Sequence, residues 1–183
     1  KSRCISRKYA RESMLKSFSR RELTGEKELR GAVYSAFKNR AMMYYHIFDE
    51  LRKEVGERKA AAILKRGIYN RGVEIGKQLL AQYGPDDLEG LKKAFLGLDP
   101  DGGKMFSAEV LKSDAEGIDL RFHRCPLREA WQEAGLSDEE TAKICAIAAR
   151  VDNGTFEGAG FEFFAETWKA EQGNCCYLHI RPG

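Results

Sequence analysis

The apolar residues of this chain keep a helical period up to residue 98 and a strand-like alternation after it. The change falls at one turn, Asp99-Pro-Asp-Gly-Gly103. Proline and glycine in such a cluster end regular structure. The turn resembles the start of a calcium-binding loop, but the spaced acidic ligands and final Glu of that loop do not follow. It therefore predicts a loop where helical structure gives way to mixed structure.

Before this turn, apolar side chains recur at helical spacing in three long segments and one short one. They cover residues 3–21, 29–55, 57–83 and about 87–98. The third segment is interrupted by Gly67, Gly72 and Gly76, each costing a helix about 1 kcal/mol relative to Ala. Glycines at such a cost indicate that another backbone or a ligand comes close.

After the turn, strands and short helices alternate. We expect strands at 106–111, 117–124, 161–168 and 176–180, the last two paired, and helices at 126–134 and 137–151. In the second strand, alternation places Asp119, Arg121, His123 and Cys125 on one face. Pro126 suits a first helical turn, and Ser137 to Glu140 form a capping box. The expected fold is α+β, a helical N-terminal half packed with a small antiparallel sheet in the C-terminal half.

Charge is spread unevenly along the chain. Residues 1–73 hold 19 Lys and Arg against 8 Asp and Glu, and residues 74–183 hold 12 against 20. This asymmetry favours a basic half that docks on the acidic half, within the chain or across a homo-oligomer, over nucleic-acid binding. We expect a basic helical arm at 1–25 and a single α+β domain at 26–183.

Composition indicates a globular protein of the cytoplasm. The chain has 183 residues, 43% hydrophobic and 32% charged, and no apolar run approaches the roughly 20 residues of a membrane helix. Its basic start lacks the apolar core of an export signal. Five cysteines without regular spacing or a Cys-x-x-Cys pair predict reduced thiols rather than a disulfide framework or a zinc ribbon.

Cysteines carry the strongest candidates for chemistry. Cys175 and Cys176 are adjacent at the start of the last strand; in a strand they point to opposite faces, so one is a candidate and the other packs. Cys175 would share a face with His179. Cys125 lies two residues after His123 and just before a helix N-terminus, which stabilises a thiolate.

The second candidate is the segment Asp152-Asn-Gly-Thr-Phe-Glu-Gly-Ala-Gly160. It is interpreted as a glycine-rich loop in which Asp152 or Glu157 acts as a general base. If the strands carrying Cys125, His123, Cys175 and His179 converge, a zinc site is conceivable, although we expect no cofactor. His46 is a weaker candidate, and Cys145 is expected to be inert packing in a helix.

These residues carry a resemblance over residues 118–181. Phe122-His-Arg-Cys-Pro126, the Cys145 helix leading to Asp152, Glu166-Thr167-Trp168 and Gly173-Asn-Cys-Cys-Tyr-Leu-His-Ile-Arg181 resemble the family of L-2-amino-thiazoline-4-carboxylic acid hydrolases. The spacing from Cys145 to Asp152 and the segment at 153–160 depart from the family pattern.

The resemblance implies a hydrolase that opens a small cyclic amidine or thioimidate. Cys125 or Cys175 would attack the carbon between sulfur and nitrogen, and Asp152 or Glu157 would transfer protons. His123 or Arg121 would stabilise charge or hold a substrate carboxylate, with Thr167, His179 and His46 as further binding residues. The alternative is a non-catalytic small-molecule or metal-binding sensor, because helices before a cysteine-bearing sheet also resemble the 4-vinyl reductase type of domain.

Overall fold

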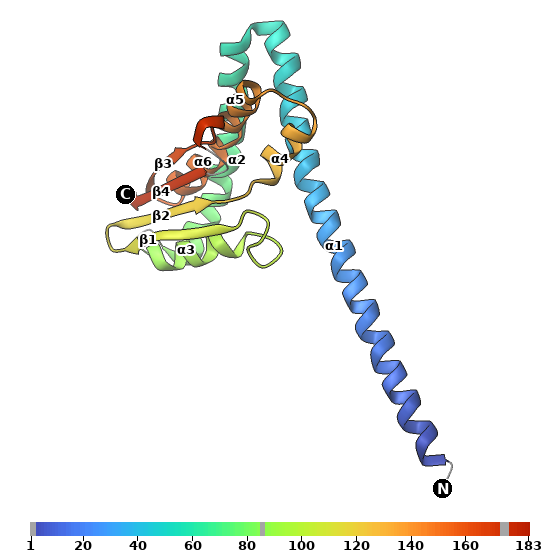
Figure 1. The fold of residues 1–183 in the computed structure, drawn as a ribbon. Coiled ribbons are helices and arrows are strands. Elements are labelled where there is room, and N and C mark those ends of the chain that lie inside the picture. The colour runs from blue at the N-terminus through green and yellow to red at the C-terminus, as the bar shows by residue number, and fades with distance from the viewer. Residues whose placement is uncertain (1–2, 85–86, 173–175) are drawn as a thin grey trace. The chain divides into compact units, whose positions relative to one another are not determined.

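The computed structural model describes residues 3–84, 87–172 and 176–183, with side chains from Gly25 onward (Figure 1). Helices fill the N-terminal half, and an antiparallel sheet lies in the C-terminal half, which confirms the α+β fold. The elements are α1 (Arg3–Val55), α2 (Glu57–Tyr83), α3 (Leu88–Gly97), β1 (Ala108–Asp114), β2 (Gly117–Phe122), α4 (Pro126–Glu133), α5 (Asp138–Ala148), α6 (Arg150–Gly158), β3 (Phe161–Glu166), the 3₁₀ turn η1 (Ala170–Gln172) and β4 (Cys176–Pro182).

The chain divides into two compact units. The first, residues 1–36, holds the N-terminal part of α1, and its residues 25–32 are exposed. The second, residues 37–183, holds the rest of α1 and every other element. The cores and the sheet lie in the second unit.

Helices of the second unit begin where local chemistry favours a start. Asp87 is the N-cap of α3 and accepts a hydrogen bond from Gly90 N at 2.8 Å. Pro126 opens α4, where its missing N–H leaves no helical bond unmade. Ser137 caps α5 by accepting from Glu140 N at 3.2 Å, as the capping box predicts.

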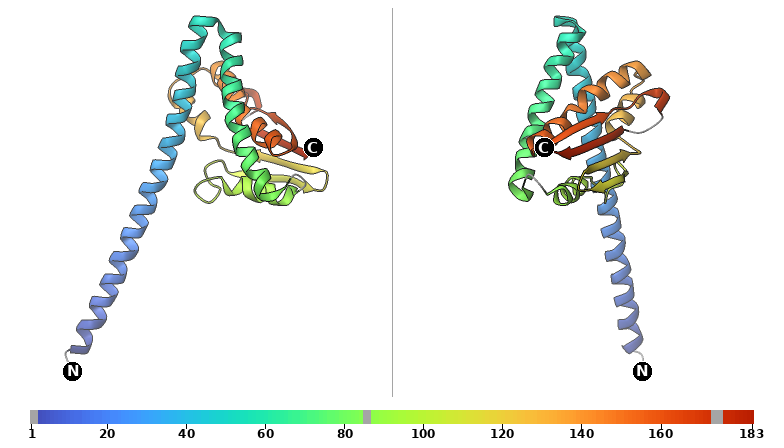
Figure 2. Two further views of the ribbon diagram at one scale, coloured as in Figure 1. Left: turned by 180° about the vertical axis from the view of Figure 1, so that it is seen from behind. Right: turned by 90° about the vertical axis from the view of Figure 1, so that its left-hand side faces the viewer.

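The sheet has four strands in the order β1-β2-β4-β3, each antiparallel to its neighbours (Figure 2). Strands β3 and β4 pair, as expected from the sequence. Leu120 lies opposite Leu178, and both are buried beneath the helices, whereas the alternate positions Asp119 and His179 lie opposite each other on the other face. Alternation thus gives the sheet an apolar inner face and a polar outer face.

Close contact between α2 and α6 depends on glycines in both helices. A Cβ added to Gly72 would lie 2.1 Å from Val151 O, one added to Gly76 would lie 2.2 Å from Thr155 O, and one added to Gly154 would lie 2.1 Å from Tyr69 O. The expectation that a backbone or a ligand comes close is confirmed for Gly72 and Gly76, where the backbone of α6 lies. It is wrong for Gly67, which has nothing within 4 Å.

The same contact corrects the interpretation of residues 152–160 as a loop. Residues 150–158 form α6, although Asn153-Gly154 is a typical turn pair. Tertiary packing overrides the local propensity here, because glycine lets α6 lie directly against the backbone of α2.

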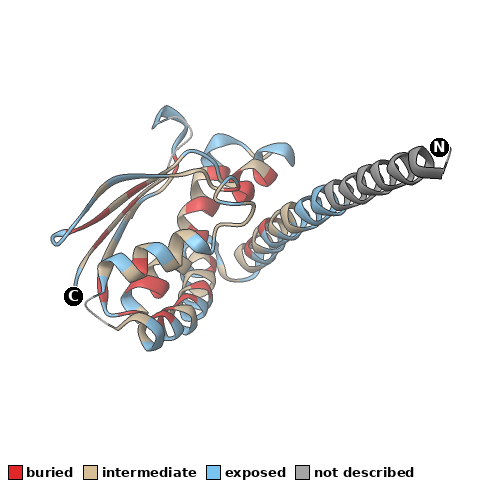
Figure 3. Ribbon diagram, turned by 90° about the horizontal axis from the view of Figure 1, so that it is seen from below, coloured by how far each residue is buried: buried red, intermediate tan, exposed pale blue. Residues whose placement is uncertain are grey.

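Two hydrophobic clusters form the core of the second unit, and Figure 3 shows its buried positions. The first joins the end of α1 and the start of α2 to α4 and α5, around Trp131 and Phe48. The second joins the end of α2, α3 and α6 to the inner face of the sheet, around Phe156 and Leu120. Cys176 packs against both clusters.

Basic side chains of α1 pair with acidic side chains of the later helices. Lys38 Nζ lies 2.7 Å from Glu133 Oε2, and Arg52 Nη1 lies 2.7 Å from Glu140 Oε2. Docking of basic on acidic segments therefore occurs within the second unit. Of the helices in the described residues, none combines the length and the apolar character needed to cross a membrane.

Candidate functional site

A cavity of about 320 Å³ lies where the two hydrophobic clusters meet. This volume is at the lower end of the range for small-molecule sites. Most of its lining is apolar, and the polar and sulfur-bearing residues in the lining are Arg40, Asp99, Cys125, Cys145, Asp152, Thr155, Thr167 and Cys176. The cavity therefore brings three cysteines and a carboxylate together from separate segments of the chain.

Cys125 lies at the N-cap position of α4 with extended backbone angles. Burial raises the pKa of its thiol, while the backbone amides of Leu127 and Arg128 and the charge of Arg128 oppose the rise. These amides belong to the first turn of α4, whose N–H groups have no helical acceptor. Burial outweighs these groups, so the pKa of the Cys125 thiol stays above its usual value, and the helix N-terminus only reduces the rise.

Cys176 begins β4 directly opposite Phe122 of β2, so both side chains lie on the inner face of the sheet. Burial raises the pKa of its thiol to about 12, with the charge of Cys125 as the next cause. Cys145 is buried in α5. Burial, together with the charges of Cys125 and Cys176, raises the pKa of its thiol well above the usual value. Cys145 packs in the core as expected, and it also lines the cavity.

Asp152 lies in the first turn of α6 and reaches the same cavity. Burial raises the pKa of its carboxyl from 3.8 to about 7, and the charge of Arg40 opposes the rise. The charge of Asp152 in turn raises the pKa of Cys125 and of Cys176. A carboxyl with this pKa can both accept and return a proton near neutral pH.

Of the other candidates, Thr167 lines the cavity. Cys175 lies outside the described residues. Cys125 and His123 do not share a face: β2 ends at Phe122, and the chain turns into α4, so the alternation stops before Cys125. His123 is exposed, and its Nε2 lies 2.8 Å from Glu109 Oε2.

The remaining predicted residues lie away from the cavity lining. Arg121 lies 3.9 Å from Glu109 Oε2, and its guanidinium stands over the Tyr177 ring. Glu157 is exposed and accepts a hydrogen bond from Tyr69 Oη at 2.8 Å. His46 is exposed on α1.

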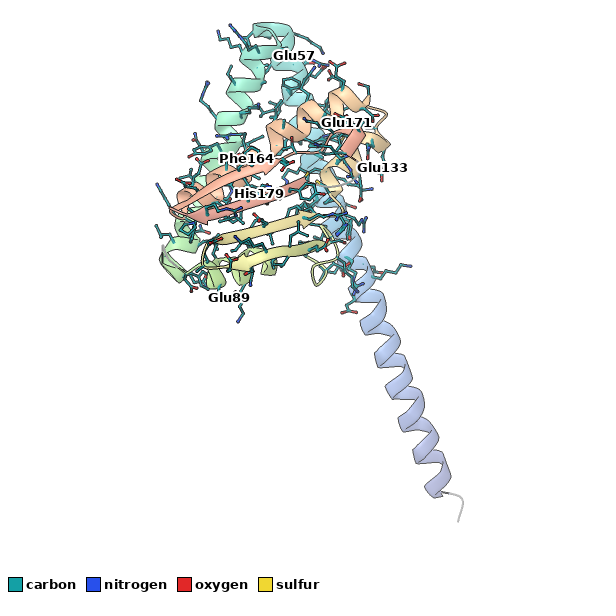
Figure 4. All side chains as sticks on the ribbon, turned by 60° about the vertical axis from the view of Figure 1, so that its left-hand side comes forward. Glu57, Glu89, Glu133, Phe164, Glu171 and His179 are labelled. Atoms are coloured by element: carbon teal, nitrogen blue, oxygen red, sulfur yellow. The ribbon has the colours of Figure 1, made fainter. Side chains whose placement is uncertain are left out.

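His179 belongs to the outer face of the sheet, where Figure 4 shows it near Phe164 on the neighbouring strand. Its Nδ1 lies 2.8 Å from Asp119 Oδ1, and its Nε2 lies 3.4 Å from Glu166 Oε1. Strands β2 and β4 do pair. Within β4, however, Cys176 lies on the inner face of the sheet and His179 on the outer face.

Among the described residues, no three His, Cys, Asp or Glu side chains gather as metal ligands. His123 and His179 are each engaged by carboxylates outside the cavity. The conceivable zinc site of two sulfurs and two nitrogens therefore has no support in the part of the chain that is described.

Sequence reasoning missed one cation in the cavity lining, Arg40, and one that acts on the cavity thiols, Arg128. Arg40 lines the cavity and lies over the Phe37 ring at 4.5 Å. Arg128 is buried, with its guanidinium 6.0 Å from the Trp168 ring, and its charge acts on all three thiols. For Arg128 the available signal was its position as a charged residue on the apolar face of a short helix, next to Leu127 and Trp131.

Comparison with known proteins places the chain in a family. No curated protein matches it. A solved structure of a trafficking protein particle complex subunit 3 from Naegleria fowleri, covalently bound to palmitic acid, is similar at 16% identity with a TM-score of 0.49, covering 81% of this chain and 95% of that one. The sequence model for L-2-amino-thiazoline-4-carboxylic acid hydrolase matches residues 36–180. The chain therefore belongs to the L-2-amino-thiazoline-4-carboxylic acid hydrolase family.

Proposed function

We propose that this protein is a hydrolase that opens a small cyclic amidine or thioimidate, with Cys125 as the nucleophile and Asp152 as the proton-transferring group. One observation carries the proposal: a thiol at a helix N-terminus and a carboxyl with a pKa of about 7 share one cavity and interact electrostatically. A nucleophile with an adjacent general base is the usual arrangement for covalent catalysis. Membership of a hydrolase family supports the same reaction class.

The reaction begins with proton transfer from the Cys125 thiol to the ionised Asp152 carboxylate. The thiolate attacks the substrate carbon between sulfur and nitrogen, forming a C–S bond while the C=N electron pair moves to nitrogen. Asp152 returns the proton to that nitrogen. The lone pair of a nitrogen that stays on this carbon then re-forms a C=N bond as a ring bond breaks. The ring sulfur or nitrogen leaves with the electron pair of that bond and takes the proton that the C=N nitrogen loses.

Water completes the cycle. Asp152, ionised again, takes a proton from water, and the hydroxide attacks the carbon bound to Cys125. The C=N electron pair moves to nitrogen, which then takes the hydroxyl proton as the oxygen forms C=O. The bond to Cys125 breaks at the same time, and the thiol is restored with the proton held by Asp152. The net change is the addition of one water to the substrate, so no oxidant or reductant is required.

Neighbouring groups support this assignment of roles. The Leu127 and Arg128 amides and the Arg128 charge favour a thiolate at Cys125. Cys176, with its pKa near 12, stays protonated at neutral pH. Arg40, in the lining and electrostatically coupled to Asp152, is suited to bind a substrate carboxylate. Thr167 remains a proposed binding residue, since it lines the same cavity.

Mass spectrometry of single variants tests the mechanism. Cys125→Ala and Asp152→Asn are expected to abolish turnover of L-2-amino-thiazoline-4-carboxylate while remaining folded, and Cys145→Ala is the matched thiol control that keeps turnover. The value of kcat/KM should rise with pH toward about 7, because only ionised Asp152 accepts the thiol proton. Full activity of both folded variants would refute the proposed site.

A second candidate function is binding without turnover. Burial raises the pKa of all three cavity thiols, and a protonated thiol is a weak nucleophile. In that case, ligands of the cavity would raise the melting temperature of the protein, and no cyclic amidine or thioimidate incubated with it would gain a water. Turnover that depends on Cys125 would exclude this function.

A further inference from the structure

Four aromatic rings form a continuous wall of the cavity. The Phe106 ring centroid lies 5.6 Å from that of Phe37 and 5.5 Å from that of Phe122, and Phe95 stacks on Phe122 at 6.3 Å. All four rings line the cavity, and we call them the aromatic wall. Contacts at these distances are typical of favourable aromatic pairs, so the wall is a packed surface and not a set of separate side chains.

The aromatic wall lies beside the reactive groups. Phe122 lies directly opposite Cys176 in the register of β2 and β4, and Cys125 follows Phe122 by three residues. At the Phe37 end of the wall, Arg40 stands over the Phe37 ring at 4.5 Å. A molecule in this cavity therefore meets thiols, apolar rings and one cation.

The volume exceeds what a small polar ring needs. An apolar cavity of roughly 150 Å³ is large enough to hold benzene, and this cavity measures about 320 Å³. Leu96, Leu98 and Leu178 continue the apolar lining beyond the aromatic wall. A substrate with only a ring, an amino group and a carboxylate would leave part of this apolar surface without a partner.

We infer that the substrate carries an alkyl or aryl group in addition to its reactive amidine or thioimidate ring, and that the aromatic wall binds this group. The inference deepens the proposed function and rests on it for the identity of the reactive ring. The apolar group gains free energy by leaving water, and the wall is preformed to receive it.

Asp99 holds part of the wall in place. Its carboxylate accepts the Phe106 backbone N–H, with distances of 3.3 Å to Oδ1 and 3.2 Å to Oδ2. Asp101 and Ser107, in the same connection, adopt positive φ angles of 60° and 51°. The connection between α3 and β1 is thus pinned so that Phe106 lies against Phe37 and Phe122.

A homologous series tests the inference. L-2-amino-thiazoline-4-carboxylates with 5-alkyl groups from methyl to hexyl are titrated by calorimetry into the Cys125→Ala variant, which removes turnover from the measurement. Affinity should increase about threefold to fourfold per methylene until the cavity is full. Phe106→Ala should remove most of this gain, and Phe106→Leu should restore part of it.

Phe164→Ala is the matched control, because Phe164 is 61% exposed on the outer face of the sheet and should not affect affinity. Constant affinity along the series, or equal losses in Phe164→Ala and Phe106→Ala, would overturn the inference. If the unsubstituted ring is hydrolysed and the series is flat, the inference fails and the proposed function stands. If affinity rises with chain length and wild-type protein hydrolyses no member, the proposed function fails and the apolar site stands.

Discussion

Replacing Asp152 by Asn should make the protein more stable at alkaline pH while removing its proposed activity. Burial in the cavity raises the pKa of this carboxyl from 3.8 to about 7. Ionising it in the folded protein is therefore costly, whereas the unfolded chain ionises it freely. Asn keeps the shape of the neutral acid and carries no charge to desolvate.

The sign and size follow from proton linkage. Between the unfolded and folded pKa values, the folded state binds one more proton, so stability falls with rising pH by about 1.4 kcal/mol per unit. The stability that the neutral Asp152 carboxyl contributes is full below the pKa of the unfolded chain, and it is lost as pH rises through the folded value near 7. Relative to wild type, Asp152→Asn should thus gain about 2 to 3 kcal/mol between pH 5 and pH 8.

Urea denaturation of both proteins at pH 5, 6, 7 and 8 measures this difference, since groups common to both cancel. Asp119→Asn is the control. Burial alone would raise the pKa of Asp119, but its hydrogen bonds with His179 and Arg181 outweigh burial and hold that pKa below its usual value. This variant should be less stable at every pH of the series. A pH-independent difference between Asp152→Asn and wild type would refute the reasoning.

Four further variants test packing. Gly72→Ala should lower the free energy of unfolding by about 2 to 3 kcal/mol, since its Cβ would lie 2.1 Å from a backbone oxygen of α6. Gly67→Ala, with nothing within 4 Å of the added Cβ, should raise the free energy of unfolding by about 0.5 to 1 kcal/mol. Equal effects of the two variants in urea denaturation would contradict the helix contact. Trp131→Phe removes the 2.8 Å hydrogen bond from the indole N–H to the Ala41 carbonyl and leaves a gap in the core, so it should cost about 1 to 3 kcal/mol. An unchanged denaturation midpoint would count against this prediction. Cys145→Ala should cost about 1 kcal/mol with unchanged turnover, and a slowed rate in the folded variant would assign Cys145 to the chemistry.

Local signals in the sequence predicted the helix starts and the class of fold. Pro126 and Ser137 begin α4 and α5 at the expected residues. Caps and prolines act through neighbouring backbone groups, so their effect is legible without knowledge of the fold. The alternation after residue 117 likewise predicted which face of β2 is buried.

Features whose role depends on a distant partner could be predicted only in part. Gly72 and Gly76 indicated a close backbone, but the partner was the very segment that Asn153-Gly154 had suggested was a loop. A turn pair and a helix-crossing pair look alike in one sequence, because both need a residue without a Cβ.

The site shows the same division. Cys125 and Asp152 were candidates from their own neighbourhoods, and both line the cavity. Arg40 was missed because its role depends on how α1 packs in the second unit, which no local pattern encodes. Strand alternation predicted that His123 and His179 belong to the site. In the structure β2 ends before His123, and the cavity lies on the inner face of the sheet with Cys176, whereas His179 is on the outer face.

The most direct test of the proposed hydrolase is mass spectrometry of wild-type protein and Cys125→Ala incubated with cyclic amidines and thioimidates, headed by L-2-amino-thiazoline-4-carboxylate and its 5-alkyl derivatives. The proposal predicts a product heavier by one water with wild type and none with Cys125→Ala. It also predicts a covalent adduct on the Cys125 peptide when the wild-type reaction is quenched early. Equal turnover by the two proteins, or no product across the panel with folded wild type, would contradict it.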